Sequence, residues 1–219
     1  MIRFTFPDIV RGLVSGLFWT VGLSLIAFLG GGLAGFAILM ARLSRNRIVS
    51  RAASLYIEFF QGAPLLMQLF LVFFGFSLLG FNISPLATAA SVLTLYAGAY
   101  LGEIWRGSVE SLPRGQWEAA ESLALGRWAQ LRLVILPQAL RISIPPTVGF
   151  SVQLVKGTAV TSIIGFLEIT KAGTMIANAT YRPLMVYGLA ALGYFLLCFP
   201  LSLAARRLER RFHAPADKR

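Results

Sequence analysis

The sequence predicts an all-α protein that crosses a membrane five times. Of its 219 residues, 57% are apolar and only 13% are charged, which is more apolar side chain than a soluble core of this size can hide. The apolar residues gather in five stretches, each near the ~20 residues that a bilayer core requires. Most Lys and Arg residues lie in alternate segments between those stretches. We expect one domain, residues 1–219.

The first expected span covers residues 12–40. Its apolar run is much longer than the ~7–15 residues of a secretory signal core and ends in arginines, which predicts a retained helix. Apolar residues before it predict a short interfacial start. Three glycine pairs place small residues one turn apart, which predicts close helix packing. The pairs are Gly12 with Gly16, Gly31 with Gly35, and, in a later span, Gly98 with Gly102.

Four further spans are expected at residues 57–79, 86–106, 148–170 and 184–205. Each apolar stretch is interpreted as one continuous helix. The connection between the third and fourth spans, about residues 107–147, is the longest, and it is much more polar than its neighbours. A functional role is therefore sought in this connection first.

Basic residues predict the topology. Fifteen of the 20 Lys and Arg residues lie in alternate segments, which all fall on one side of a membrane that is crossed five times. The positive-inside bias places those segments and the C-terminus in the cytoplasm, with the N-terminus outside. The residues are Arg42, Arg45, Arg47 and Arg51; Arg106, Arg114, Arg127, Arg132 and Arg141; and Arg206, Arg207, Arg210, Arg211, Lys218 and Arg219. This placement accounts for the net charge of +11 without a nucleic acid partner.

No catalytic, phosphate-binding or metal-binding pattern is evident. Cys198 is the single cysteine, so a disulfide within the chain is excluded. The single histidine, His213, lies in a polar tail and is expected to be solvated. The glycines do not fit the spacing of a phosphate-binding loop. We therefore expect no catalytic residue, no metal site and no cofactor in this chain.

A segment of the long connection carries the most informative pattern. Residues 118–126 are EAAESLALG, and residues 135–139 are ILPQA. This spacing resembles the cytoplasmic coupling loop of bacterial ABC importer permeases, in which Glu-Ala-Ala is followed by Gly and then by Ile/Leu-Leu-Pro. The resemblance implies contact with a separate ATPase through Glu118, Ala119, Ala120, Leu123, Gly126, Leu136 and Pro137.

The resemblance extends over most of residues 12–205. YIEFFQGAPLLMQLF at 56–70 and AYLGEIWRG at 99–107 resemble the second-helix and third-helix signatures of polar amino acid permeases, and GQWEAA at 115–120 resembles their form of the loop. LPQALR at 136–141, Pro145, Pro146 and the pair Lys156 and Thr158 complete the set. The chain thus resembles permease subunits of the histidine, glutamine and cystine type. A type I ABC importer permease fold is implied.

Local chemistry supports a helix in the coupling segment. Pro113 is expected to begin a new local structure, and residues 117–125 can form two helical turns with Glu118 near the favourable N-terminal end. Gly126 is expected to end that helix. The alternative is an ordinary amphipathic helix at the membrane interface.

Polar residues within the predicted spans are candidates for a solute path, because charge at membrane depth is costly. The candidates are Gln61, Gln68, Tyr100, Glu103, Gln153, Lys156 and Thr158. Glu168 is a further ionisable residue in the fourth predicted span. Pairing of Glu103 with Arg106, or hydrogen bonds between helices for the neutral residues, are alternatives.

The substrate expectation depends on Gly157. Many of the permeases that the chain resembles have Asp directly after the lysine that corresponds to Lys156. Gly157 stands there in this chain, so a carboxylate that would attract a cationic solute is missing. We expect a neutral or acidic amino acid, although a second permease subunit is able to supply the missing acid.

The resemblance also implies the partners. These are two ATPase subunits that bind ATP and Mg, a second permease that is either identical or paralogous, a periplasmic amino-acid-binding protein, an amino acid and the lipid of a bacterial inner membrane. An ion-gradient-driven secondary transporter or channel subunit is the alternative function. That alternative predicts acidic groups at midspan, of which the sequence has few.

Overall fold

The computed structural model describes residues 5–212, within which the chain is almost entirely helical and contains no strand. His213, Lys218 and Arg219 lie outside the described residues. The elements are α1 (Phe6–Arg42), α2 (Arg47–Gly62), α3 (Leu65–Leu78), α4 (Pro85–Glu110), α5 (Arg114–Ser122), α6 (Arg127–Ala129), a π-helical stretch (Gln130–Ile135), α7 (Leu136–Gly157), a 3-10 turn (Thr158–Ser162), α8 (Ile169–Thr180) and α9 (Pro183–Phe212).

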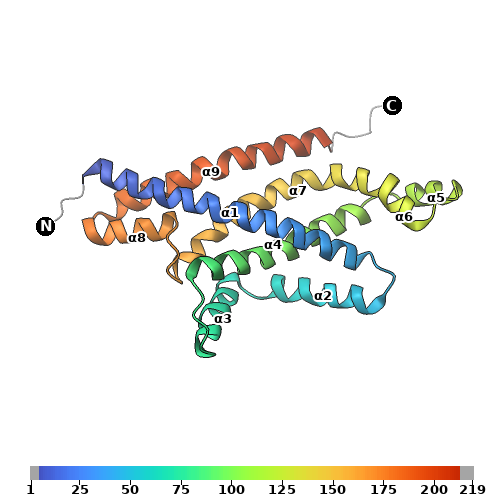
Figure 1. Cartoon of the computed structure of the whole chain (residues 1–219). Helices are drawn as coiled ribbons and strands as arrows, with labels where there is room; N and C mark the ends of the chain where they lie inside the picture. Colours follow the sequence, from blue (N-terminus) through green and yellow to red (C-terminus); the bar gives the residue numbers. More distant parts are fainter. Residues whose placement is uncertain (1–4, 213–219) are drawn as a thin grey trace.

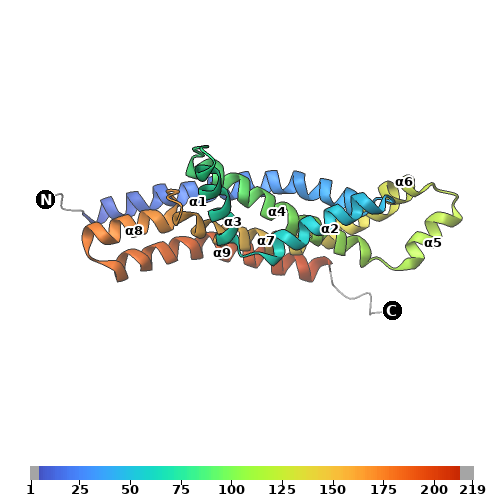
Figure 2. The ribbon, with the colours of Figure 1, turned by 90° about the horizontal axis from the view of Figure 1, so that it is seen from below.

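The helices form an elongated bundle (Figures 1 and 2). Helices α1, α4, α7 and α9 run along its length, and α3 projects from its side (Figure 1). Helix α8 lies at one end, beside the start of α1, whereas α5 and α6 form the tip of the opposite end (Figures 1 and 2). The coupling segment predicted from the sequence therefore lies at the far tip of the bundle.

Glycines bring α1 and α4 into close contact, as the sequence predicted. A β-carbon added to Gly35 would stand 3.0 Å from the backbone nitrogen of Gly102, and one added to Gly98 would stand 2.9 Å from the β-carbon of Ala34. Gly31 faces Ala97 at similarly short range. Since these distances leave no room for larger side chains, the glycines set the separation of the two helices.

The second predicted span, residues 57–79, is not one helix. Helices α2 and α3 meet at Ala63 and Pro64 with a bend of 100°. Proline has no backbone N–H and disfavours helical geometry in the residue before it, so the chain turns here. The Nε2 of Gln68 donates to the carbonyls of Phe60 and Ala63, both at 2.9 Å, and so satisfies backbone groups that the bend exposes.

The fourth predicted span, residues 148–170, begins too late and ends too late. The helical path runs unbroken from Arg127 to Ser162 and passes Pro145 and Pro146 within α7. It ends before Gly165, whose φ of 92° lies in the left-handed region. A π-helical stretch precedes α7, and Pro137 follows in its first turn, where a missing N–H costs little.

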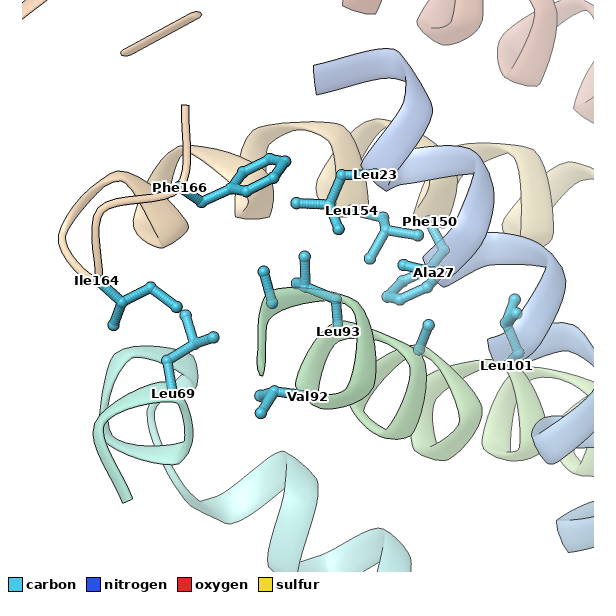
Figure 3. Close-up of a cluster of buried hydrophobic side chains, with 12 residues drawn as sticks. Leu23, Ala27, Leu69, Val92, Leu93, Leu101, Phe150, Leu154, Ile164 and Phe166 are labelled. Carbon is cyan, nitrogen blue, oxygen red and sulfur yellow. The ribbon is translucent and has the colours of Figure 1, made fainter. Parts of the chain in front are cut away.

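A buried apolar cluster joins four helices at the middle of the bundle (Figure 3). Leu23 of α1, Leu69 of α3, Leu93 of α4 and Leu154 of α7 are each at most 1% exposed. Phe166, from the segment after the 3-10 turn, packs against the same cluster. The bent pair α2 and α3 is thereby anchored to the long helices through α3.

Within residues 5–212, three helical segments are long and apolar enough to cross a membrane, namely Phe6–Arg42, Arg127–Ser162 and Pro183–Phe212, and the bent pair α2 and α3 is a fourth if it counts as one span. Helix α4, predicted at 86–106, has 26 residues but is not among them. Small and polar side chains on its buried face, such as Thr88, Gly98 and Ser108, lower its apolar content. These residues suit a helix packed against α1, α2, α3 and α7.

Candidate functional site

A helix follows Pro113, as the sequence predicted, but it covers Arg114–Ser122 and not residues 117–125, so Glu118 lies in its second turn. The N–H of Leu125 donates to the carbonyl of Ala120 at 3.3 Å, and that of Ala124 donates to Glu121 at 2.8 Å. These two hydrogen bonds end α5, and Ala124 takes the left-handed conformation there, with a φ of 54°.

Gly126 therefore does not end the helix, contrary to the prediction. Its φ is −62°, and it caps the N-terminus of α6. A β-carbon added at Gly126 would meet nothing within 4 Å. Neither backbone conformation nor internal packing within the chain requires glycine at this position.

The outer surface of the segment is exposed. Glu118 and Ala119 are exposed, and Leu123 is 73% exposed although it is a large apolar residue. Ala120, in contrast, is only 2% exposed and faces the bundle. An open cavity of about 640 Å³ lies beside this surface, lined by Arg45 from the connection between α1 and α2, and by Trp117, Glu121, Ala124, Leu125, Gly126, Arg127 and Gln130.

Two glutamines attach the segment to the long helix that follows it. The Nε2 of Gln138 in α7 donates to the Oε1 of Gln116 in α5 at 3.0 Å. The Nε2 of Gln130 donates to the carbonyl of Leu125 at 2.7 Å. Trp117 packs against a buried cluster that contains Leu131. These contacts join residues 116–125 to the segment Arg127–Ser162.

Leu136 and Pro137 lie away from this surface. Both line an apolar cavity between α1, α4 and α7, which Phe36 and Trp105 also line. The structure thus brings Glu118, Ala119, Leu123 and Gly126 to one exposed tip, but it places the Leu-Pro pair in the wall of the bundle.

Two solute-path candidates share one face of α7. Gln153 and Lys156 are both exposed, and so are Pro146 and Gly149, which precede them at helical spacing. Neither of the two ion pairs within residues 5–212 includes Lys156. These four exposed residues, of which Gln153 is polar and Lys156 is charged, are called the polar strip, and they lie on the outside of a helix that is long and apolar enough to cross a membrane.

Glu103 and Tyr100 lie on α4 beside that helix. The guanidinium of Arg106 donates to both carboxylate oxygens of Glu103, at 2.8 and 2.6 Å, and also pairs with Glu110. Glu103 lines an open cavity of about 510 Å³ between α4, α7 and α9. Tyr100 stacks on Phe150, with ring centroids 5.3 Å apart. Glu103 is therefore paired within the chain, which was the alternative to a free solute ligand.

The remaining candidates are divided. Gln61 is exposed near the end of α2. Gln68 is 4% exposed and holds the bend between α2 and α3, although its Oε1 finds no partner among the described residues. Thr158 is fully buried and donates to the carbonyl of Val155 at 2.7 Å. Gln68 and Thr158 therefore face protein in the described chain.

Glu168 is a structural residue that the sequence placed inside a span. It is fully buried at the N-terminus of α8, where its carboxylate accepts from the backbone N–H groups of Thr170 and Lys171 at 2.9 and 2.8 Å. The hydroxyl of Tyr194 in α9 donates to it at 2.7 Å. Tyr194 gave no signal of this role in the sequence, because the two residues are far apart along the chain.

The chain as a whole is similar to known transport proteins. Residues 33–214 match the family model described as binding-protein-dependent transport system inner membrane component. The L-cystine transport system permease protein TcyB of Bacillus subtilis (strain 168) is 36% identical over 212 residues, which cover 96% of this chain and 89% of that protein. The glutamine transport system permease protein GlnP of Escherichia coli (strain K12) is 34% identical, with 91% and 92% covered.

Solved structures agree with this assignment. A crystal structure of an amino acid ABC transporter with histidines contains a chain with a TM-score of 0.88 and 32% identity, covering 96% of this chain and 100% of that one. An inward-facing structure of the MetNI methionine ABC transporter, at 20% identity and a TM-score of 0.79, shares the fold. The chain therefore belongs to the family of binding-protein-dependent transport system inner membrane components, and its relatives include permeases of amino-acid ABC transporters.

Proposed function

We propose that this chain is the permease subunit of an ATP-driven importer that moves an amino acid from periplasm to cytoplasm by alternating access. The observation that supports this most is the exposed tip formed by Glu118, Ala119, Leu123 and Gly126, which is joined to a membrane-crossing helix. Such a tip suits a partner that pushes on it from outside the bilayer.

The ATPase is a separate protein in this proposal. Leu123 offers an apolar anchor, and the cavity beside it has Glu121, Arg127 and Arg45 for polar contacts. Two ATPase subunits bind ATP and Mg. The pair closes when ATP is bound, and each subunit then presses on the tip of one permease. The hydrogen bonds of Gln116 and Leu125 carry the movement into α7.

A second permease subunit faces the polar strip of α7. Lys156 and Gln153 are exposed on a helix that is able to cross a membrane, and charge in contact with lipid is costly. A second subunit, identical or paralogous, removes that cost by enclosing an aqueous path between the two strips. The solute then passes along Gln153 and Lys156, after delivery by a periplasmic binding protein.

An amino acid is the proposed solute, in keeping with the transport permeases to which the chain is similar. Gly157 follows Lys156 without a carboxylate, and Glu103 is already paired with Arg106. Within the described chain, a cationic side chain therefore finds no free acid beside Lys156. This supports a neutral or acidic amino acid.

The test reconstitutes the permease with its cognate ATPase and measures amino acid uptake that depends on ATP. We expect Glu118→Lys and Gly126→Val each to reduce uptake sharply while membrane insertion stays normal. Gly126→Val is informative because the glycine has open space around it, so the added side chain meets no other part of the described chain.

Gly188→Val in α9 is the matched control. This glycine also has nothing within 4 Å of an added β-carbon, but it lies far from the coupling tip. Normal uptake by Glu118→Lys or Gly126→Val with a fully assembled ATPase would contradict the coupling role. Uptake by the permease in vesicles that contain an ion gradient but no ATPase would favour the secondary transporter or channel instead.

A further inference from the structure

An apolar groove lies outside the coupling tip and the polar strip. It is an open cavity of about 430 Å³ between α1, α4 and α7. Phe36 and Leu39 form its wall on α1, Trp105 and Val109 form its wall on α4, and Leu140 lies on its α7 side. Phe36 and Leu140 are 52% and 63% exposed, so the groove opens to the outside of the described chain.

The groove runs along the helices from near the end of the bundle that carries α5 and α6 toward its middle. Arg132 lines one end, and Leu140 lies eight residues further along the same helical path, which corresponds to ~12 Å at a helical rise. The walls on α1 and α4 belong to the last turns of those helices, before Arg42 and Glu110. Figure 1 shows these helix ends near α6.

Arg132 gives the groove a cationic mouth. Its side chain is exposed, and it belongs to neither of the two ion pairs within residues 5–212. The other lining residues are apolar except Ser143, whose hydroxyl already donates to the carbonyl of Leu140 at 2.9 Å. The groove therefore combines an apolar channel with a single uncompensated positive charge at one end.

We propose that this groove binds an anionic phospholipid, with an acyl chain along Phe36, Trp105 and Leu140 and the phosphate group on Arg132. Two of its three walls belong to segments that are able to cross a membrane, so bilayer lipid is the molecule that meets them at high concentration. Basic pockets between membrane helices suit acidic headgroups, and an apolar groove alone would accept any lipid chain. The arginine therefore makes the site selective for negative lipid.

Trp105 provides a direct probe, because its ring lines the groove and its Nε1 donates to Thr147. The full chain is purified with Trp19, Trp117 and Trp128 changed to Phe, and it is reconstituted in vesicles that contain phospholipid with brominated acyl chains. Bromine quenches tryptophan fluorescence on contact. Brominated phosphatidylglycerol and brominated phosphatidylcholine are compared at equal mole fraction.

We expect phosphatidylglycerol to quench Trp105 more strongly than phosphatidylcholine. Arg132→Gln should remove most of this preference, about fivefold in apparent affinity if one arginine contributes ~1 kcal/mol. Arg141→Gln is the matched control, since this exposed arginine of α7 does not line the groove, and it should keep the preference.

Equal quenching by the two lipids, or a preference that persists in Arg132→Gln, would overturn the proposal. Absence of quenching by either lipid would overturn it as well, because another protein surface would then cover the groove. Native mass spectrometry of the detergent-purified chain gives a second measurement. Retained phosphatidylglycerol should fall in Arg132→Gln and stay unchanged in Arg141→Gln at equal monodispersity.

Discussion

Gly35 of α1 and Gly102 of α4 lie so close together that a β-carbon added to Gly35 would stand 3.0 Å from the backbone nitrogen of Gly102. The two backbones are in near-direct contact, and the neighbouring Gly31 and Gly98 extend the contact along both helices. Lipid offers no hydrophobic drive to helix association, so close backbone packing is a main source of stability here.

Gly31→Val should therefore destabilise the protein. The added side chain would collide with Ala97, and overpacking of this kind costs ~1–3 kcal/mol. Gly22→Val on the same helix is the control, because nothing lies within 4 Å of a β-carbon there. Thermal unfolding in detergent measures the difference. Equal melting temperatures for the two variants would contradict the packing role.

Gln68→Ala should loosen the bend between α2 and α3. Loss of the amide leaves the carbonyls of Phe60 and Ala63 without this donor, at ~1–3 kcal/mol for a buried group. Faster hydrogen exchange at the start of α3 is the expected result. Gln61→Ala, at an exposed position of α2, should leave exchange unchanged. If Gln68→Ala exchanged as slowly as the parent, the bend would be held by Pro64 and packing alone.

Lys156→Ala should change transport more than Lys171→Ala at matched expression. Lys156 is exposed on the polar strip of α7, whereas Lys171 holds Glu168 through its backbone N–H, which alanine retains. Labelled amino acid uptake by the reconstituted complex measures both variants. Near-normal uptake by both would remove Lys156 from the proposed path. A strong preference of the intact complex for arginine or lysine would overturn the substrate proposal.

Cysteines introduced at Asn82 and Ser44 should report the topology. Both positions are exposed, at the connections that follow α3 and α1. The positive-inside bias predicts that an impermeant thiol reagent added from the periplasm labels position 82 and spares position 44. Cys198 is buried and gives a low background. The reverse labelling pattern would require the N-terminus to lie in the cytoplasm.

Sequence reasoning found the helical class and the glycine contacts because both depend on local pattern. It missed the bend at Ala63 and Pro64, since the apolar run continues on both sides and periodicity alone does not show a break. Pro64 itself was the available signal. The fourth span was placed at residues 148–170, whereas the helix continues through Pro145 and Pro146, because membrane helices tolerate proline where neighbouring groups compensate.

The site was predictable where it depends on the order of residues along the chain. Most of residues 118–126 are exposed at the tip of the bundle, but the left-handed residue that closes α5 is Ala124, at a cost of ~1–2 kcal/mol relative to glycine. Because glycine is the residue that most often adopts this conformation, the sequence predicted that Gly126 would end the helix. The burial of Ala120, Gln68 and Thr158 depends on tertiary packing, which no local pattern specifies.

The buried carboxylate of Glu168 has a mechanical consequence. It bonds the start of α8 to Tyr194 of α9, while the Oγ1 of Thr20 in α1 accepts from the N–H of Ile169 at 3.2 Å. The start of α8 is thus hydrogen-bonded to both α1 and α9. A movement of α8 relative to either helix would have to break one of these buried bonds, whereas Gly165, in the short non-helical link before α8, has the φ of 92° that glycine adopts without strain.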